Sequence, residues 1–361
     1  MFTTTKTKQR MRRWRAAALV LVAATLAGPA AAQSWGGSAA SETSMMALYD
    51  KAKAAGEQQI VIYGPFSVTF KPLWDTFSKR FPGITVVGTP ISGSAMIAKV
   101  DAEVRSGQRT VDIIMSGITD IVSAADLGRT ELYAPPNAHE ALLPEYIDGK
   151  GRFVANYAGL VGFLYNTDKI AEKDLPKTLK DLLDPRFKGM VVDDPFSGML
   201  TSIAWTQYLS AGKIDAAWIK AIKPNLTVVP TTAPYFANVT TGAISSLPFN
   251  SFNRYVNLKK SGAKVGFVTT PGMSAPSLNG MAIIKSPPHS RAAELMMAWF
   301  ITPEAQNALS AQGSYPLARG ATVPSDWPVF KDISAAVPAM LPDAFQKARA
   351  ELEKVGREAF R

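Results

Sequence analysis

The sequence predicts an α/β protein built from two lobes. Short apolar runs of strand length alternate with segments whose apolar residues recur at helical spacing, a pattern typical of a parallel sheet covered by helices. A second set of such elements begins after residues 149–151. The chain has 361 residues, of which 47% are hydrophobic. That is enough for more than one core, so two α/β lobes are favoured over a single sheet.

Three strands and two helices are predicted in the first part of the chain. The strands are expected at 59–63, 84–87 and 111–115, and the helices at 70–81 and 96–104. Each strand is a short apolar run, and each helix repeats apolar residues every three or four positions. Pro82-Gly83 ends the first helix, because proline cannot continue a helix and glycine adopts turn conformations that other residues avoid.

The second set of elements starts with a long apolar run at 158–165. A strand is then expected at 190–192, helices at 197–209 and 214–222, strand-like runs at 244–247, 264–269 and 280–284, and closing helices at 290–300, from 302 onward and over 343–360.

We expect the chain to cross between the lobes twice, at 157–165 and at 269–280. The first lobe is predicted to comprise 33–158, with 270–310 returning to it, and the second lobe 159–269, with 311–361 packing on it.

The first 32 residues have the features of a cleaved export signal. Six Lys and Arg residues, with no acid among them, precede an apolar run at 16–27 that is too short to span a bilayer. Gly28-Pro29 breaks this run, and Ala30-Ala31-Ala32 fits a small-residue cleavage site. We expect a mature periplasmic protein that begins near Gln33; the alternative is a single anchoring helix.

The charge balance gives no support to nucleic-acid binding. The full chain carries 39 Lys and Arg against 29 Asp and Glu, a net charge of +10. Six of the basic residues lie in the predicted signal, which leaves 33 against 29 and a net charge of +4. No stripe of Lys and Arg could follow a phosphate backbone, so we expect no nucleic-acid partner.

The sequence contains no cysteine. This excludes a thiol nucleophile, a Cys-ligated metal and a disulfide framework. It also excludes lipid attachment through a cysteine after the signal, so we expect the protein to be free in the periplasm.

Catalytic signatures are also absent from the sequence. The chain has no G-x-S-x-G, no G-x-x-x-x-G-K-[ST], no H-E-x-x-H and no G-x-G-x-x-G. His139 and His289 are its two histidines, and both are interpreted as exposed loop residues with no motif partner. We therefore expect no catalytic residues, no cofactor, no metal site and no enzymatic activity.

Three strand-to-helix turns carry small hydroxyl-bearing residues. They are Ser92-Gly93-Ser94, Ser116-Gly117 and Ser197-Gly198. Taken singly, each is explained more simply as a helix cap. Together, however, they lie at the carboxyl ends of strands, where an open α/β sheet binds ligands at the positive ends of helices.

Several aromatic residues are placed to line a cleft. Tyr63 and Phe66 lie at the end of the first strand, and Tyr157 lies where the chain passes between the lobes. Residues 249–255 alternate aromatics with amides, a pattern that fits either a loop followed by a helix start or a ligand-contacting loop.

Several motifs resemble the ferric-iron-binding, family 1 branch of the periplasmic solute-binding proteins. They are Ile60–Gly64, Val111–Gly117, Leu164–Asp168 continuing to Asp184–Gly189, Gly280–Lys285 and Thr302–Gln306. The resemblance covers nearly all of the mature chain. It implies a type II periplasmic-binding-protein fold, in which two α/β lobes joined by crossing hinge strands close on a ligand. It also implies a monomer that serves an inner-membrane ABC permease.

The iron ligands of that branch do not match this sequence. Its iron-binding members use a histidine, a glutamate and adjacent tyrosines, and Ser67, Gly117, Phe252 and Asn253 stand at those positions here. None of the four supplies the anionic oxygen that ferric iron prefers. We therefore expect a small polar or anionic organic solute. The alternatives are a ferric-iron receptor that uses an external chelating anion, a sensor subunit, and a periplasmic hydrolase or lyase.

The predicted ligand site draws on both lobes. Its residues are Tyr63, Phe66, Ser67, Ser94 and Ser116 from the first lobe, Tyr157 at the crossing, and Ser197, Gly198, Thr232, Asn250 and Asn253 from the second.

Overall fold

The structure, a computed structural model, describes residues 37–196 and 200–360. Trp35–Arg361 forms one compact unit. The predicted signal at 1–32 and two predicted ligand residues, Ser197 and Gly198, lie outside the described residues. Within the described ranges, no helix has the length and apolar character needed to cross a membrane.

One large sheet runs through this unit, with strand order β10-β4-β9-β3-β1-β2 and with β7 and β8 also paired to β4. Its strands are β1 (Gln59–Tyr63), β2 (Thr85–Thr89), β3 (Ile113–Gly117), β4 (Val154–Asn166), β7 (Ser246–Ser251), β8 (Val265–Val268), β9 (Ala275–Ile283) and β10 (Tyr315–Pro316). β1 is parallel to β2 and β3, as the alternation of strands and helices predicts. A separate parallel pair is formed by β5 (Met190–Asp193) and β6 (Leu226–Val229).

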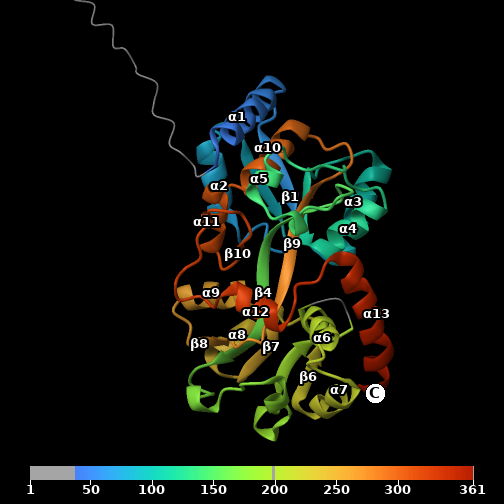
Figure 1. The fold of residues 1–361 in the computed structure, drawn as a ribbon, viewed down its shortest axis with the longest axis vertical. Coiled ribbons are helices and arrows are strands. Elements are labelled where there is room, and N and C mark those ends of the chain that lie inside the picture. The colour runs from blue at the N-terminus through green and yellow to red at the C-terminus, as the bar shows by residue number, and fades with distance from the viewer. Residues whose placement is uncertain (1–36, 197–199, 361) are drawn as a thin grey trace, which may run out of the picture. The chain divides into compact units, whose positions relative to one another are not determined.

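β4 and β9 are the strands that connect the two lobes (Figure 1). The first half of β4 pairs antiparallel with β9, from Val154 opposite Met281 to Val161 opposite Ala275. Its second half pairs instead with β7 and β8. One thirteen-residue strand is thus shared by both lobes, which explains the long apolar run in the sequence: most of its residues are buried.

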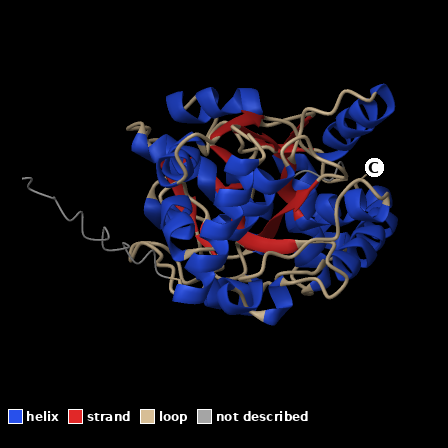
Figure 2. Ribbon diagram, turned by 90° about the horizontal axis from the view of Figure 1, so that it is seen from above, coloured by secondary structure: helices blue, strands red, loops and turns tan. Residues whose placement is uncertain are grey.

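Helices cover both sides of the strands (Figure 2). Those of the predicted first lobe are α1 (Ala39–Ala54), α2 (Lys71–Arg80), α3 (Gly93–Ser106), α4 (Ile118–Asp126), α5 (Ala138–Ala141), α10 (Ser290–Phe300) and α11 (Pro303–Ser310). Those of the predicted second lobe are α6 (Leu200–Ser210), α7 (Ala216–Ile222), α8 (Phe236–Thr241), α9 (Phe252–Lys260), α12 (Phe330–Ala336) and α13 (Pro342–Ala359). Short 3-10 helices are η1 (Pro144–Tyr146), η2 (Glu172–Asp174), η3 (Leu179–Leu183), η4 (Pro185–Phe187), η5 (Lys223–Asn225) and η6 (Ala233–Tyr235).

Local sequence signals set the starts of several helices. Asp215 caps α7 by accepting the Trp218 N–H at 2.8 Å. Thr302 caps α11 by accepting the Ala305 N–H, and Pro303 occupies the first helical position, where its missing N–H costs nothing.

The buried apolar residues form several clusters along the crossing strands, and one that is centred on the first lobe also includes Phe252 of α9. Two clusters gather residues of α1 to α4 and α10 around β1, β3 and the first half of β4. Another gathers α6, α7 and the second half of β4, together with Leu352 of α13. The segment after residue 310 packs on clusters of both lobes. Ile333 of α12 belongs to a cluster of the first lobe, and Val337 belongs to the cluster around α6 and α7. The exact lobe boundaries stay a prediction.

Candidate ligand-binding site

A pocket lies where β3, β9, α4, α6 and the start of α13 meet. Its lining residues are Gly117, Ile118, Thr119, Ile203, Gln207, Pro276, Ser277, Leu278, Met340 and Phe345. Gly117 to Thr119 belong to the β3–α4 turn on the first-lobe side, and Ile203 and Gln207 lie on α6, on the second-lobe side. The pocket is therefore lined from both sides of the crossing strand β9.

The β3–α4 turn presents the backbone of a helix start to this pocket. Gly117 is the N-cap of α4 and makes no side-chain cap bond. Ser116, predicted as a ligand residue, is buried and donates its hydroxyl to Asp120 Oδ2 at 2.6 Å. This hydroxyl is thus committed within the first lobe, and the first turn of α4 offers its N–H groups and the Thr119 side chain instead.

Gln207 is a pocket residue that the sequence analysis missed. It is 3% exposed, and its Nε2 donates to the Pro276 carbonyl at 2.7 Å. Its Oε1 is buried and has no hydrogen-bond partner among the described residues. Nothing in the local sequence singles this residue out, because its partner on β9 is 69 positions away.

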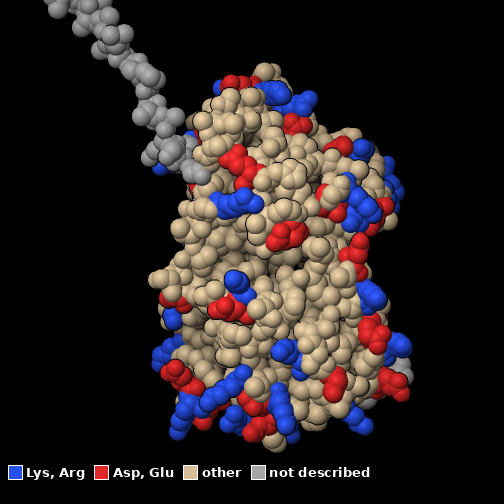
Figure 3. All heavy atoms as spheres, in the orientation of Figure 1, with Lys and Arg blue, Asp and Glu red and all other residues tan. Residues whose placement is uncertain are grey.

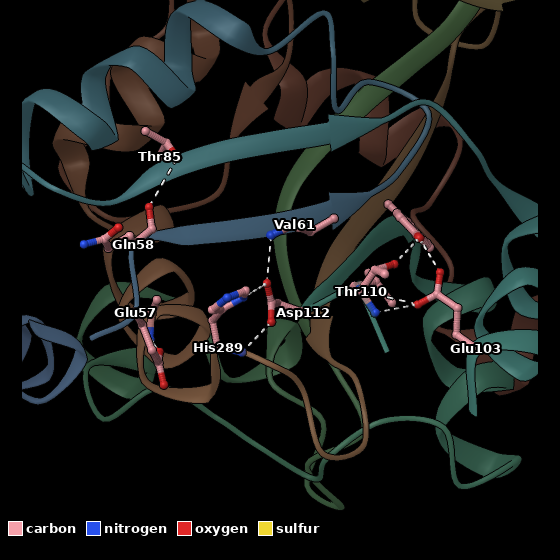
Figure 4. Close-up of polar contacts among 11 residues, drawn as sticks. Glu57, Gln58, Val61, Thr85, Glu103, Thr110, Asp112 and His289 are labelled. Atoms are coloured by element: carbon pink, nitrogen blue, oxygen red, sulfur yellow. Dashed lines mark hydrogen bonds and ion pairs between the residues drawn. The ribbon is translucent and has the colours of Figure 1, made fainter. Parts of the chain in front are cut away.

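Tyr63 is held inside the first lobe by hydrogen bonds to Glu103 and Thr110, two residues labelled in Figure 4. Its hydroxyl donates to Glu103 Oε1 and lies 2.9 Å from Thr110 Oγ1. Glu103 also accepts the Thr110 N–H at 2.9 Å and lies 3.2 Å from Lys99 Nζ. Burial alone would raise the pKa of Glu103, but the bonds from Tyr63, Thr110 and Lys99 outweigh it and lower the pKa to about 2.

Phe66 and Ser67 lie in the turn after β1. Ser67 is 1% exposed; its hydroxyl donates to the Gly64 carbonyl at 2.8 Å, and its own carbonyl accepts the Trp74 Nε1–H at 2.6 Å. Phe66 is half-buried and stacks on Phe70, with ring centroids 5.6 Å apart. Both residues stabilise the turn itself.

Of the remaining predicted ligand residues, Ser94 is exposed to solvent and Tyr157 is buried. Ser94 is exposed in the first turn of α3. Tyr157 is 1% exposed, packs edge-on against Phe70, and has a hydroxyl without a hydrogen-bond partner in the described part of the chain. Burial raises the pKa of this phenol, so it stays protonated.

The second-lobe residues Thr232 and Asn250 lie together. Asn250 Nδ2 donates to Thr232 Oγ1 at 3.1 Å, and both side chains are buried. Phe249, the preceding residue, has φ of +58°, a strained value for a bulky side chain. Asn253 lies on α9 and donates to the Gln312 carbonyl. Thr232 and Asn250 are thus two predicted ligand residues whose side chains the structure joins by a hydrogen bond.

The flanks of the predicted Ser197 turn are described, although the turn is not. Asp193, at the end of β5, accepts the Thr201 N–H at 2.9 Å, and burial raises its pKa. Phe196 packs against α13, edge-on to Phe360 and in close contact with Gly356.

The four positions matched to iron ligands lie in the first-lobe turns and on α9. Phe252 packs against the rings of Phe267, Tyr315 and Trp327. Across residues 37–196 and 200–360, no three His, Asp or Glu side chains are grouped to hold a metal ion.

His289 is not the unpartnered loop residue that the sequence analysis expected. Its backbone N–H donates to Asp112 Oδ1 at 2.8 Å, and its Nδ1 lies 3.0 Å from Asp112 Oδ2, which also accepts the Val61 N–H at 2.8 Å (Figure 4). Asp112 is fully buried and links β1 to the start of α10. The interpretation of His289 as unpartnered was therefore wrong. Its partner lies 177 positions away, so no local pattern indicates the pair. His139 is exposed, as predicted, on the short helix α5.

Comparison with solved structures defines the class of protein. The iron-bound HitA of Pseudomonas aeruginosa matches with a TM-score of 0.69 and 20% identity, covering 83% of this chain and 99% of that one. AfuA of Actinobacillus pleuropneumoniae, solved with fructose-6-phosphate, matches with a TM-score of 0.65 and 19% identity, covering 83% and 97%. The chain has the type II periplasmic-binding-protein fold, and this prediction is confirmed.

The sequence comparison identifies the family. Residues 73–335 match the family described as bacterial extracellular solute-binding protein, and the chain belongs to that family. The Fe(3+)-binding periplasmic protein of Serratia marcescens is 25% identical over 293 residues, which are 77% of this chain and 84% of that protein. The predicted resemblance to periplasmic solute-binding proteins of ABC importers is therefore confirmed.

Proposed function

We propose that the protein is the periplasmic receptor of an ABC importer and captures a small polar or anionic organic solute by lobe closure. The observation that carries this proposal is the pocket lined by α4, α6 and β9. Because residues on both sides of the crossing strands line it, a solute bound there favours the arrangement in which the two sides lie close together. Closure would present both lobes to an inner-membrane permease.

The chemistry of the matched iron positions supports an organic solute. Ser67 is committed to its own turn, Gly117 has no side chain, and Phe252 is packed among aromatic rings. Ferric iron prefers anionic oxygen ligands, and these residues provide none. A ferric receptor that relies on an external chelating anion is the second candidate, favoured by the names of two relatives, the Serratia marcescens protein and HitA.

The charge distribution on one face of the molecule supports our proposal that nucleic acid is not a partner. On the face drawn in Figure 3, Lys and Arg are interspersed with Asp and Glu, and no continuous basic stripe runs across it. We propose a monomer that is exported by a cleaved signal and lies free in the periplasm. Sequencing of the mature N-terminus tests this: a start near Gln33 supports export with cleavage, and an intact Met1 on a membrane-bound product contradicts it.

The solute itself is tested by native mass spectrometry of the protein purified from the periplasm. We expect an organic molecule to remain bound under gentle conditions and to leave on unfolding. Small-angle scattering before and after its removal should show expansion on removal, because the ligand stabilises the closed form. A protein that carries no solute and shows no change in compactness on addition of candidate solutes would contradict the receptor proposal.

The two candidate functions are separated by a titration with ferric citrate. We expect no charge-transfer absorbance from tyrosinate and iron, and no tight binding by calorimetry, because the four matched positions lack anionic oxygen. Submicromolar ferric binding that requires citrate or phosphate would establish the second candidate instead.

A further inference from the structure

Gln207 combines deep burial with an unused hydrogen-bond acceptor. Its Nε2 is fixed on the Pro276 carbonyl at 2.7 Å, so the amide is held in one orientation while its Oε1 stays unpaired in the described part of the chain. Buried polar atoms are almost always paired, because an unpaired one loses its bond to water without replacement. Gln207 lines the pocket, and we take the spare acceptor of its side chain to indicate a hydrogen-bond donor supplied from outside the chain.

Another part of the pocket wall is formed by the β3–α4 turn. The first turn of α4 begins at Gly117 without a side-chain cap, and the nine-residue helix directs its positive end toward this wall. The Thr119 side chain also lines the pocket. This wall suits a carboxylate or another acceptor group.

The remaining walls are mostly apolar. Ile118, Leu278 and Phe345 line them, and Phe345 belongs to α13, beyond the residues matched by the family. These walls provide no basic side chain that could balance a second negative charge. They favour a short carbon skeleton over a heavily charged or heavily hydroxylated ligand.

We infer that this pocket receives a short carboxylic acid that also carries a hydroxyl or amino group, and that Gln207 is the residue that selects it. The carboxylate contacts the first turn of α4, and the hydroxyl or ammonium group donates to Gln207 Oε1. This inference rests on the proposed receptor function and specifies its solute class. An acid of the same skeleton without the donor leaves Gln207 Oε1 unpaired and is rejected for that reason.

The experiment is calorimetric titration of the mature protein, stripped of any bound solute, with lactate, alanine and propionate. The three share a three-carbon skeleton, and only propionate lacks the donor. We expect lactate or alanine to bind at least about tenfold more tightly than propionate, the discrimination that one satisfied buried hydrogen bond provides. Gln207→Met should reduce this ratio to about one.

A matched control is Gln306→Met. Gln306 is also fully buried, but its Oε1 already accepts the Leu317 N–H at 2.9 Å. This variant should keep the preference over propionate even if it is less stable.

Three results would overturn the inference. They are equal binding of all three acids, retention of the preference in Gln207→Met, and binding of none of them, as expected if a water molecule alone pairs with Gln207. The receptor proposal survives each of these if native mass spectrometry still finds a different bound solute, so the two failures are distinguishable.

Discussion

Two buried glutamines in different regions of the molecule use their side chains differently. Gln306, on α11 in the first lobe, bonds at both ends: Nε2 donates to the carbonyls of Asn156 and Phe300 at 2.8 Å each, and Oε1 accepts from Leu317. Gln207, at the pocket, bonds at one end only. Both side chains are buried, so burial alone does not distinguish them; they differ in the number of satisfied hydrogen bonds.

The largest effect is expected for Gln306→Met. The change leaves the Leu317 N–H and the Asn156 carbonyl without this partner inside the protein, and unpaired buried groups cost about 1–3 kcal/mol each. We expect the free energy of unfolding to fall by about 3 kcal/mol in urea denaturation. Gln108→Met, at an exposed position, is the control and should change it by less than about 0.5 kcal/mol. A loss below about 1 kcal/mol in Gln306→Met would remove the contrast on which the comparison depends.

An intermediate effect, dependent on pH, is expected for Glu103→Gln. The pKa of Glu103 is about 2 in the folded protein, below the ordinary value of 4.5. The carboxylate therefore stabilises the fold at pH above its ordinary pKa, and this stabilisation is lost as the pH falls from about 4.5 toward 2. We expect a loss of about 2 kcal/mol at pH 7, the range for hydrogen bonds to a charged group, and a smaller loss at pH 3.

Urea unfolding at both pH values measures this difference. Glu351→Gln, on the exposed face of α13, is the matched control and should change stability little at either pH. An equal loss from Glu103→Gln at pH 7 and pH 3 would show that the charge of Glu103 does not contribute.

The smallest effect on stability is expected for Gln207→Met. The variant loses one hydrogen bond to Pro276 but also removes an unpaired buried oxygen, and methionine fills a similar volume. We expect the ligand-free protein to lose less than about 1 kcal/mol in urea unfolding. A loss as large as that of Gln306→Met would make Gln207 a structural residue and would weaken its assignment to a ligand.

Much of the fold could be predicted because strands and helices leave local patterns. The apolar run at 59–63 is β1, and the helix expected at 343–360 is α13. For β9, the sequence predicts a strand only at its end, from residue 280. Its first residues include Pro276, Ser277 and Asn279, which do not look like a strand. They form one because the first half of β4 requires a partner, a contact between segments more than a hundred residues apart.

Less of the candidate site than of the fold could be predicted from the sequence. The partners of Gln207 and of His289 are 69 and 177 positions away, so no local pattern could indicate either pair. The alternating segment at 249–255 fits two interpretations from its sequence alone. It ends β7 and starts α9, and its contact with a ligand stays a prediction.

The sharing of β4 has a consequence for how the chain folds. A cut between residues 158 and 159 would divide a strand in the middle of its hydrogen-bonded ladder, because Ala158 pairs with Leu278 and Gly159 with Ser277. Either half expressed alone would expose unpaired strand edges and should aggregate. The two lobes should therefore melt in one cooperative transition, and a circular permutant opened at this point should fail to fold where one opened in a surface loop succeeds.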